Sequence, residues 1–219
     1  MKLESAREAR SLGRVRKLGV YGGSFDPVHA GHLHVARVAR ARCGVEHVVF
    51  VPAAVPPHKQ QRVLASAQDR VRMLEIAIAS EPAWSISTLE LERPGPSYTV
   101  DTLRALPARL GLASDVELCF LFGWDNLRGL ERWRDADAVL ELAQPIVVWR
   151  EGTDERVFDT LRRALKPESF ERLLRGLVRE PPAPESSTEV RDRLLRGEDP
   201  SDALPPGVLE YICARGIYR

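Results

Sequence analysis

The chain is organised around one stretch near its start, Gly22-Gly23-Ser24-Phe25-Asp26-Pro27-Val28-His29-Ala30-Gly31-His32. The apolar run 18–21 before it is typical of a buried strand, and residues 33–42 after it are rich in helix formers that Gly44 can end. The glycines therefore lie at a strand-to-helix turn, where the backbone can approach a ligand closely. The N-terminus of such a helix offers unpaired N–H groups and a positive dipole end, which suit a phosphate.

Two imidazoles belong to this turn. His29 and His32 are three residues apart, a spacing that places both rings on the same side near a helix start. A phosphate-binding turn with two imidazoles indicates phosphate chemistry without an enzyme-bound nucleophile. The competing interpretation is a glycine-rich turn whose histidines are ordinary surface or core residues. The G-x-G-x-x-G fingerprint of nicotinamide dinucleotide binding is absent from the stretch.

Length and composition favour one domain and argue against several kinds of partner. The 219 residues suit a single α/β domain with a small appendage, after a flexible, polar and basic N-terminal tail at 1–17. The net charge of +1 gives no reason to expect a nucleic-acid partner. No apolar run approaches the roughly 18 residues of a membrane span, so no membrane segment is expected. Cys43, Cys119 and Cys213 lack metal spacing, which predicts reduced thiols and a cytoplasmic location.

The elements that follow predict a parallel sheet. A strand at 45–51 comes after the first helix, and this order predicts a right-handed parallel crossover. Prolines then force an extended loop, 52–59, just past the carboxyl end of that strand, where ligands bind in open α/β sheets. Further along we expect helices at 69–80, 98–106 (capped by Ser97), 136–142, 186–196 and 208–214, strands at 84–87, 88–91, 116–122 and 145–149, and a solvated helical excursion at 152–176.

A second anion site is expected in the C-terminal part of the chain. Ser186 and Glu189 fit a capping box that opens a helix. The hydroxyl residues at that N-terminus, with Arg191 in the first turns, suit a phosphate. The alternative is an ordinary, well-capped helix without a ligand.

Several of these segments resemble one family. The run 23–32 resembles the G-x-F-D-P-x-H-x-G-H motif of the nucleotidylyl transferases. The bacterial nicotinate-nucleotide adenylyltransferases are similar over a longer span, at roughly 18–150 and 185–218. The matching segments are the P-x-x-x-P-P-H-K loop at 52–59, the block 86–103, the G-x-D-x-L run at 123–127 with Trp133 eight residues past its aspartate, the S-S-T-x-x-R run at 186–191 and the L-P-P-x-V-x-x-Y-I run at 204–212. Glu151 and Glu185 depart from the family, which often has proline and isoleucine at these positions.

The resemblance implies a fold and a reaction. The fold is α/β, a Rossmann-like doubly wound parallel sheet at 18–184, with a small C-terminal helical subdomain at 185–219 that completes the ATP site. The reaction transfers the adenylyl group of ATP to nicotinate mononucleotide, giving deamido-NAD and pyrophosphate in NAD biosynthesis. Mg²⁺ is expected on the ATP phosphates, with no metal ligand from protein side chains. The mononucleotide phosphate is already a competent nucleophile, so catalysis reduces to alignment and charge stabilisation.

The resemblance also implies roles for individual residues. The expected catalytic residues are His29, His32 and Arg191. The expected ATP-binding residues are Gly22, Gly23, Ser24, Phe25, Gly31, Gly123, Asp125, Ser187 and Thr188. The expected mononucleotide-binding residues are Lys59, Ser85, Arg93, Tyr98, Trp133 and Arg134.

Three alternatives remain at this point. Phosphopantetheine adenylyltransferase shares the H-x-G-H chemistry but should lack the block 86–103 and Trp133. His29, His32 and His34 could instead hold zinc for a hydrolase, although no acidic or cysteine partner is nearby in the sequence. A nucleotide-binding regulator without activity is the third alternative, which the intact His29, His32 and Arg191 disfavour.

Overall fold

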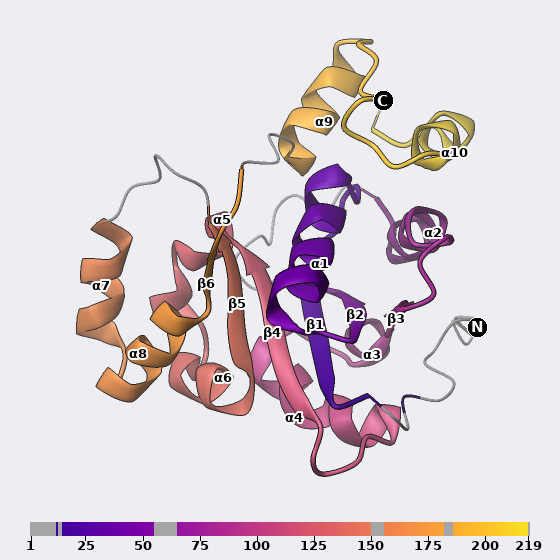
Figure 1. Cartoon of the computed structure of the whole chain (residues 1–219). Coiled ribbons are helices and arrows are strands. Elements are labelled where there is room, and N and C mark those ends of the chain that lie inside the picture. The colour runs from indigo at the N-terminus through magenta and orange to yellow at the C-terminus, as the bar shows by residue number, and fades with distance from the viewer. Residues whose placement is uncertain (1–11, 13–14, 55–64, 150–155, 182–185, 219) are drawn as a thin grey trace.

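The computed structural model describes residues 12, 15–54, 65–149, 156–181 and 186–218. Their strands form one parallel sheet of six strands in the order β3-β2-β1-β4-β5-β6 (Figure 1). The strands are β1 (Lys17–Gly23), β2 (His47–Pro52), β3 (Trp84–Ile86), β4 (Glu117–Gly123), β5 (Gln144–Trp149) and β6 (Leu177–Arg179). The strand order reverses between β1 and β4, and ligands of such sheets bind at the carboxyl ends beside that point. The predicted Rossmann-like sheet is confirmed.

Helices cover both faces of the sheet. They are α1 (Ala30–Cys43), α2 (Ala67–Ala77), α3 (Leu89–Glu92), α4 (Thr99–Leu110), α5 (Trp124–Leu127), the 3₁₀ turn η1 (Leu130–Arg132), α6 (Ala136–Leu142), α7 (Arg156–Ala164), α8 (Pro167–Arg175), α9 (Ser187–Leu195) and α10 (Val208–Arg215). Helices α1, α2 and α10 share one hydrophobic core, whereas α4, α6, α7 and α8 share the other. Figure 1 shows α1 in front of the sheet and α4 behind it.

The two cores follow from the alternation of side chains along each buried strand. In β2, Val48 and Phe50 enter the α1 core, whereas Val49 and Val51 enter the opposite core. Tyr21 of β1 pairs in register with Phe50, and all of these strand residues are almost fully buried. Burial on both faces explains why the central strands read as continuous apolar runs.

Three expectations about local structure were wrong. Residues 88–91 do not continue the strand, because Thr88 starts the short helix α3 and its carbonyl accepts the Glu92 N–H at 3.1 Å. Ser97 does not cap the following helix, because its Oγ accepts the N–H of Ala54 at 3.1 Å and Tyr98 is the cap residue. The segment 152–176 is not a solvated excursion where it is described: α7 and α8 bury Leu161 and Leu173 in the second core and lead into β6.

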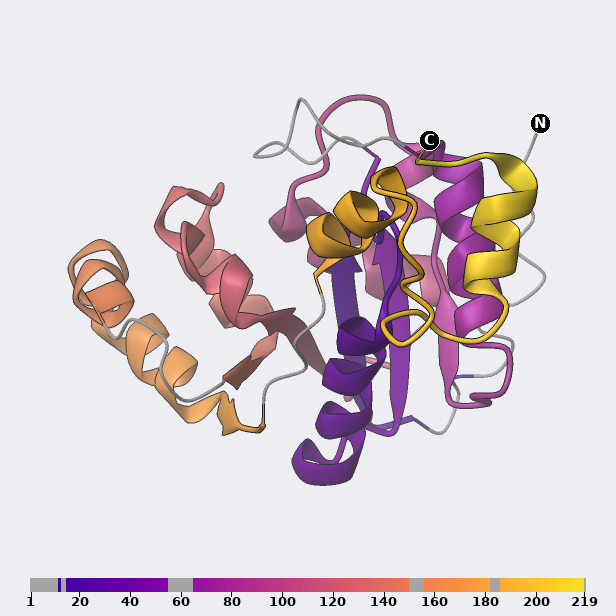
Figure 2. The ribbon, with the colours of Figure 1, turned by 90° about the horizontal axis from the view of Figure 1, so that it is seen from above.

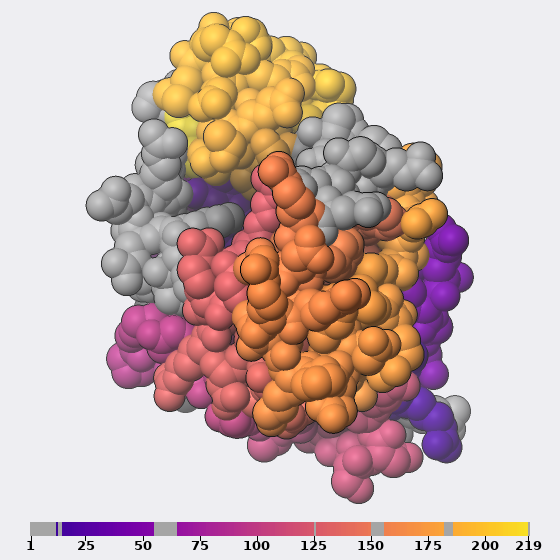
Figure 3. Space-filling view, turned by 90° about the vertical axis from the view of Figure 1, so that its left-hand side faces the viewer, coloured from indigo at the N-terminus to yellow at the C-terminus, as the bar shows by residue number. Residues whose placement is uncertain are grey.

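The chain ends pack in different ways. Residues 1–17 were expected to form a flexible tail, but Leu12 is buried in the second core and β1 begins at Lys17. At the other end, α9 lies above the start of α1, and α10 lies beside α2 (Figures 1 and 2). In the space-filling view this C-terminal unit, residues 186–218, forms the top of the molecule (Figure 3). No helix among the described residues is long and apolar enough to cross a membrane.

Candidate active site

The glycine-rich turn connects β1 to α1 as predicted. Gly22 and Gly23 end β1, and a Cβ on Gly23 would lie 3.1 Å from the ring of Phe25, so a larger residue would crowd this loop. Phe25 itself has a φ of 49°, in the left-handed region that non-glycine residues rarely adopt. Its ring is fully buried and packs edge-on at 5.6 Å against Tyr21. Phe25 therefore anchors the turn in the core and leaves its backbone to face a ligand.

The two histidines meet as their spacing predicts. His29 is the N-cap of α1, His32 lies in its first turn, and their ring centroids are 3.8 Å apart. The backbone N–H of His29 donates to Nδ1 of His32 at 3.2 Å. Because Nδ1 accepts this bond, the neutral His32 ring carries its proton on Nε2 and can donate from there. Gly31 is buried between them in the helix.

The His29 ring is buried, and burial lowers its pKa to about 4. The ring is therefore neutral at pH 7, and a neutral imidazole can meet a ligand by hydrogen bonding rather than as a cation. Its Nδ1 is buried without a hydrogen-bond partner among the described residues. A buried nitrogen without a partner at the N-terminus of a helix is a group that a bound ligand could satisfy.

The second anion site lies directly against this turn. The Ser186 side chain caps α9 by accepting the Glu189 N–H at 3.1 Å, which confirms the expected cap. The buried guanidinium of Arg191 donates to the carbonyl of Asp26 at 2.6 Å and to Oγ1 of Thr188 at 3.2 Å. The Ser187 hydroxyl donates to the carbonyl of Pro27 at 3.0 Å. The N-terminus of α9 and the N-terminus of α1 thus border one site.

Two buried charges below the turn were missed by the sequence reasoning. Arg70 of α2 is 1% exposed and donates to the carbonyl of Ser24 at 2.7 Å. Asp26 is also 1% exposed, and its carboxylate accepts the N–H of Ala65 at 3.1 Å. Asp26 was visible as the aspartate of the F-D-P run, whereas nothing in the sequence around Arg70 distinguishes it from a surface arginine of an amphipathic helix.

Three of the expected mononucleotide-binding residues, Trp133, Arg134 and Tyr98, lie near one another beside β4 and the start of α4. Trp133 follows η1 and packs against Phe120 and Phe122 of β4, with ring centroids 5.9 and 6.1 Å apart. The Arg134 guanidinium lies 4.8 Å from the centre of the Tyr98 ring and is paired with Asp101 at 3.3 Å. An aromatic surface with a cation beside it suits a planar, negatively charged ring.

The other expected residues are placed less directly. Ser85 lies within β3, 3% exposed, with its hydroxyl 2.8 Å from Nε2 of His47, and Arg93 donates to Oγ1 of Thr102 at 3.3 Å. Gly123 ends β4 at the ligand edge of the sheet. Lys59, with the rest of 55–64, and the side chain of Asp125 lie outside the described residues, as does Glu185. Their expected roles stay predictions.

The zinc alternative lacks support from this geometry. Within the described ranges no three His, Cys, Asp or Glu residues are grouped to hold a metal ion. Nδ1 of His32 is already engaged by the His29 N–H. A parallel sheet with a histidine pair at one helix N-terminus and an arginine at a second defines a nucleotidyltransferase.

Comparisons with known proteins identify the family within this class. The Cytidylyltransferase-like family matches residues 20–193. A protein of Gloeobacter violaceus named "Probable nicotinate-nucleotide adenylyltransferase" is 40% identical over 207 residues, covering 92% of this chain and 96% of its own. A protein of the same name from Dehalococcoides mccartyi is 36% identical over 203 residues, covering 93% and 97%. The chain belongs to the nicotinate-nucleotide adenylyltransferase family, and it is therefore an enzyme of the nucleotidyltransferase class.

A solved structure agrees with the fold. Plasmodium falciparum nicotinic acid mononucleotide adenylyltransferase, complexed with NaAD, superposes with a TM-score of 0.68 at 19% identity. The superposition covers 93% of this chain and 97% of that one. At this identity the likeness concerns the fold.

Proposed function

We propose that the enzyme transfers the adenylyl group of ATP to nicotinate mononucleotide, giving deamido-NAD and pyrophosphate. The observation that carries the proposal is the histidine pair at the N-terminus of α1, bordered by Arg191 from α9. Family membership, together with the aromatic surface that Trp133 forms against Phe120, supports nicotinate mononucleotide as the second substrate. The cytoplasm is the proposed location, in keeping with three cysteines that are thiols in the structure.

The proposed mechanism is an in-line displacement. A 5′-phosphate oxygen of the mononucleotide attacks the α-phosphorus of ATP, the bond to the β-phosphate oxygen breaks, and pyrophosphate leaves. The backbone of Gly22 to Phe25 lies against the phosphates, and His32 donates from Nε2 as negative charge develops. His29, kept neutral by burial, donates to a phosphate without adding a charge.

The C-terminal anion site completes the proposed ATP site. Ser187, Thr188 and Arg191 hold the β- and γ-phosphates, and Gly123 with Asp125 meets the ribose. Lys59 and Arg93 serve the phosphate of the mononucleotide, whose ring stacks on Trp133 beside Tyr98 and Arg134. The carboxylate of that ring meets backbone N–H groups near Ser85 and Arg134.

Mg²⁺ is the proposed cofactor and enters on the phosphates of ATP. The donors of this site are imidazole, hydroxyl and guanidinium groups, which match phosphate oxygens rather than a hard cation. Mg²⁺ prefers oxygen ligands and keeps several waters, so a site of this chemistry fits a metal that substrate oxygens carry. When bound, the ion supplies charge neutralisation on the leaving pyrophosphate.

The direct test is product analysis. The protein is mixed with ATP, Mg²⁺ and one mononucleotide or with phosphopantetheine, and the products are separated. Deamido-NAD and pyrophosphate in equal amounts are expected with nicotinate mononucleotide. Adenylylated phosphopantetheine would support the alternative enzyme of the same class, and nucleotide binding without any product would support a regulator.

Arg191→Ala should weaken ATP binding more than mononucleotide binding. The guanidinium is buried and charged, and losing a charge-assisted contact to phosphate should raise KM for ATP on the order of 10²-fold. Steady-state kinetics with each substrate varied in turn gives the two KM values. Arg191→Lys is the matched control, since it keeps the charge but loses the planar guanidinium. Its KM for ATP should lie between the values of the alanine variant and the parent. Unchanged KM and kcat in the alanine variant would remove α9 from the site.

Trp133→Ala should raise KM for the mononucleotide and leave KM for ATP nearly unchanged. Stacking a base on an aromatic side chain is worth about 1–3 kcal/mol, so a rise of roughly 5- to 150-fold is expected. Trp133→Phe keeps an aromatic surface, so its KM for the mononucleotide should rise much less. Equal rises in both KM values would show that Trp133 supports the core beside Phe120 rather than binding the ring.

A further inference from the structure

The turn between β1 and α1 is held from one side by the C-terminal unit, residues 186–218. Four hydrogen bonds cross between them, and each reaches a different point of the turn. The contacts are Tyr218 Oη to Oδ1 of Asp26 at 2.6 Å, Arg191 Nη1 to the Asp26 carbonyl at 2.6 Å, Ser187 Oγ to the Pro27 carbonyl at 3.0 Å and the Ala30 N–H to the Ala203 carbonyl at 2.8 Å. A loop bonded at Asp26, at Pro27 and at the start of the following helix has little freedom to shift.

Asp26 is the point at which these contacts converge. Its carboxylate is buried and receives the Tyr218 hydroxyl and the Ala65 N–H on the same oxygen. The hydroxyl comes from the penultimate residue of the chain, 192 positions further along the sequence. Arg70 of α2 donates to the nearby Ser24 carbonyl of the same turn at 2.7 Å. A buried carboxylate oxygen that accepts from two separate segments restricts the backbone that carries it.

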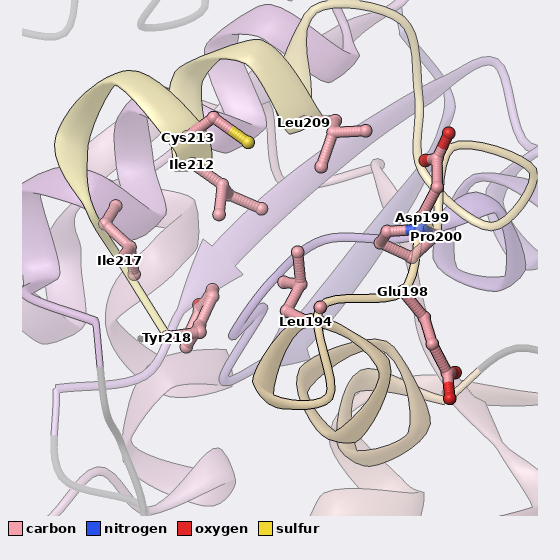
Figure 4. A pocket seen from close by; sticks show the side chains of 10 residues that line it. Leu194, Glu198, Asp199, Pro200, Leu209, Ile212, Cys213, Ile217 and Tyr218 are labelled. Atoms are coloured by element: carbon pink, nitrogen blue, oxygen red, sulfur yellow. The ribbon is translucent and has the colours of Figure 1, made fainter.

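Tyr218 is held in a defined position by the residues around it. It is 7% exposed, and its side chain lies beside a cavity of about 350 Å³ between α9 and α10, with Leu194 and Ile217 near it (Figure 4). Burial and the bond to Asp26 raise the pKa of its hydroxyl, which therefore stays a proton donor at all working pH values.

We propose that Tyr218 is a positioning residue of the reaction: through Asp26 it fixes the turn that carries His29 and His32 in the geometry needed for transfer. The kinetic part of this proposal depends on the proposed function. The C-terminal unit then has two tasks, since α9 faces the phosphates directly and the end of the chain aligns the histidines. In the proposed mechanism Tyr218 acts through Asp26 rather than on a substrate, so its effect falls on kcat rather than on binding of the mononucleotide.

The chain contains a matched control for this residue. Tyr211 of the same unit also donates its hydroxyl to a carboxylate of the body, Oδ1 of Asp69, at 2.8 Å. Asp69 lies in α2, on the helix surface that faces α10 and Arg215 rather than in the turn. Tyr211→Phe and Tyr218→Phe therefore each remove one tyrosine–aspartate hydrogen bond between the same two parts, and only the second bond reaches the histidines.

Two measurements on the full-length variants test the proposal. In Tyr218→Phe, the backbone amides of residues 26 and 28–31 should exchange with solvent about tenfold faster, as loss of a hydrogen bond to a charged group predicts, and Tyr211→Phe should leave them unchanged. This readout needs no substrate, so failure of the proposed reaction would not affect it. In turnover, Tyr218→Phe should lose about tenfold in kcat with the mononucleotide KM nearly constant. Exchange and kcat as in the parent, or equal effects in both variants, would overturn the proposal.

Discussion

Replacing His32 with alanine should leave the fold intact and abolish most of the turnover. The ring sits in the first turn of α1 with Nδ1 accepting the His29 N–H, so the neutral ring carries its proton on Nε2, the donor that the proposed mechanism uses. Removal of one preorganised donor to a developing oxyanion costs about 10²–10³ in kcat. The fold should survive because His32 is only half-buried and the core below the turn is built by Phe25 and Tyr21.

The measurement is kcat at saturating substrates, together with circular dichroism and thermal unfolding. His34→Ala is the matched control: it removes an imidazole from the same helix, two residues further on, that the proposed mechanism does not use. We expect the control to stay close to the parent. Turnover of His32→Ala within a few-fold of the parent would show that the donor in the transition state is another group.

The sequence predicted the centre of this molecule well. The strand, the glycine turn and the helix closed by Gly44 are local features, and their boundaries follow from turn and cap chemistry that is written in adjacent residues. The meeting of His29 and His32 followed from the helical period alone. The capped start of α9 at Ser186 was likewise a local signal.

The errors concern contacts between distant segments. Ser97 was expected to cap its own helix, but it bonds the Ala54 backbone, which local sequence cannot indicate. The charged, amphipathic segment before β6 was expected to be solvated, yet Leu161, Phe170 and Leu173 are buried in the second core, and α8 packs against β5. The support of the turn by Arg70 and Tyr218 joins residues far apart in the chain, and only the tertiary structure brings them together.

The same distinction applies to the site as a whole. The proposed phosphate-binding part comes from two helix N-termini, whose backbone N–H groups suit anions. The proposed ring-binding part depends on side chains from separate elements: Trp133 follows η1, Tyr98 precedes α4, and Arg134 contacts Tyr98. Specificity for the mononucleotide is therefore harder to predict from the sequence than phosphate binding.

The enzyme should prefer nicotinate mononucleotide over nicotinamide mononucleotide by at least about 10²-fold in kcat/KM, below the ~10⁴–10⁵ that hydrogen-bonding sites can reach. The two rings have nearly the same shape and would stack equally on Trp133, so stacking contributes nothing to the difference. The substituents differ, because a carboxylate accepts at both oxygens whereas an amide presents an NH₂ donor. In a pocket built from N–H donors the amide leaves one donor facing another, and both lose their partners.

Comparing kcat/KM for the two mononucleotides under identical ATP and Mg²⁺ measures this preference directly. Trp133→Ala provides an internal control, because loss of the stacking surface should lower both values by similar factors and keep their ratio. Arg134→Ala tests whether the guanidinium charge, rather than backbone N–H donors, causes the preference for the carboxylate. Its guanidinium is exposed and already paired with Asp101, so it should contribute little to the ratio if backbone N–H groups read the carboxylate. A ratio near one in the parent enzyme, or one that favours the amide, would contradict a donor-lined pocket and leave stacking on Trp133 as the main determinant of binding.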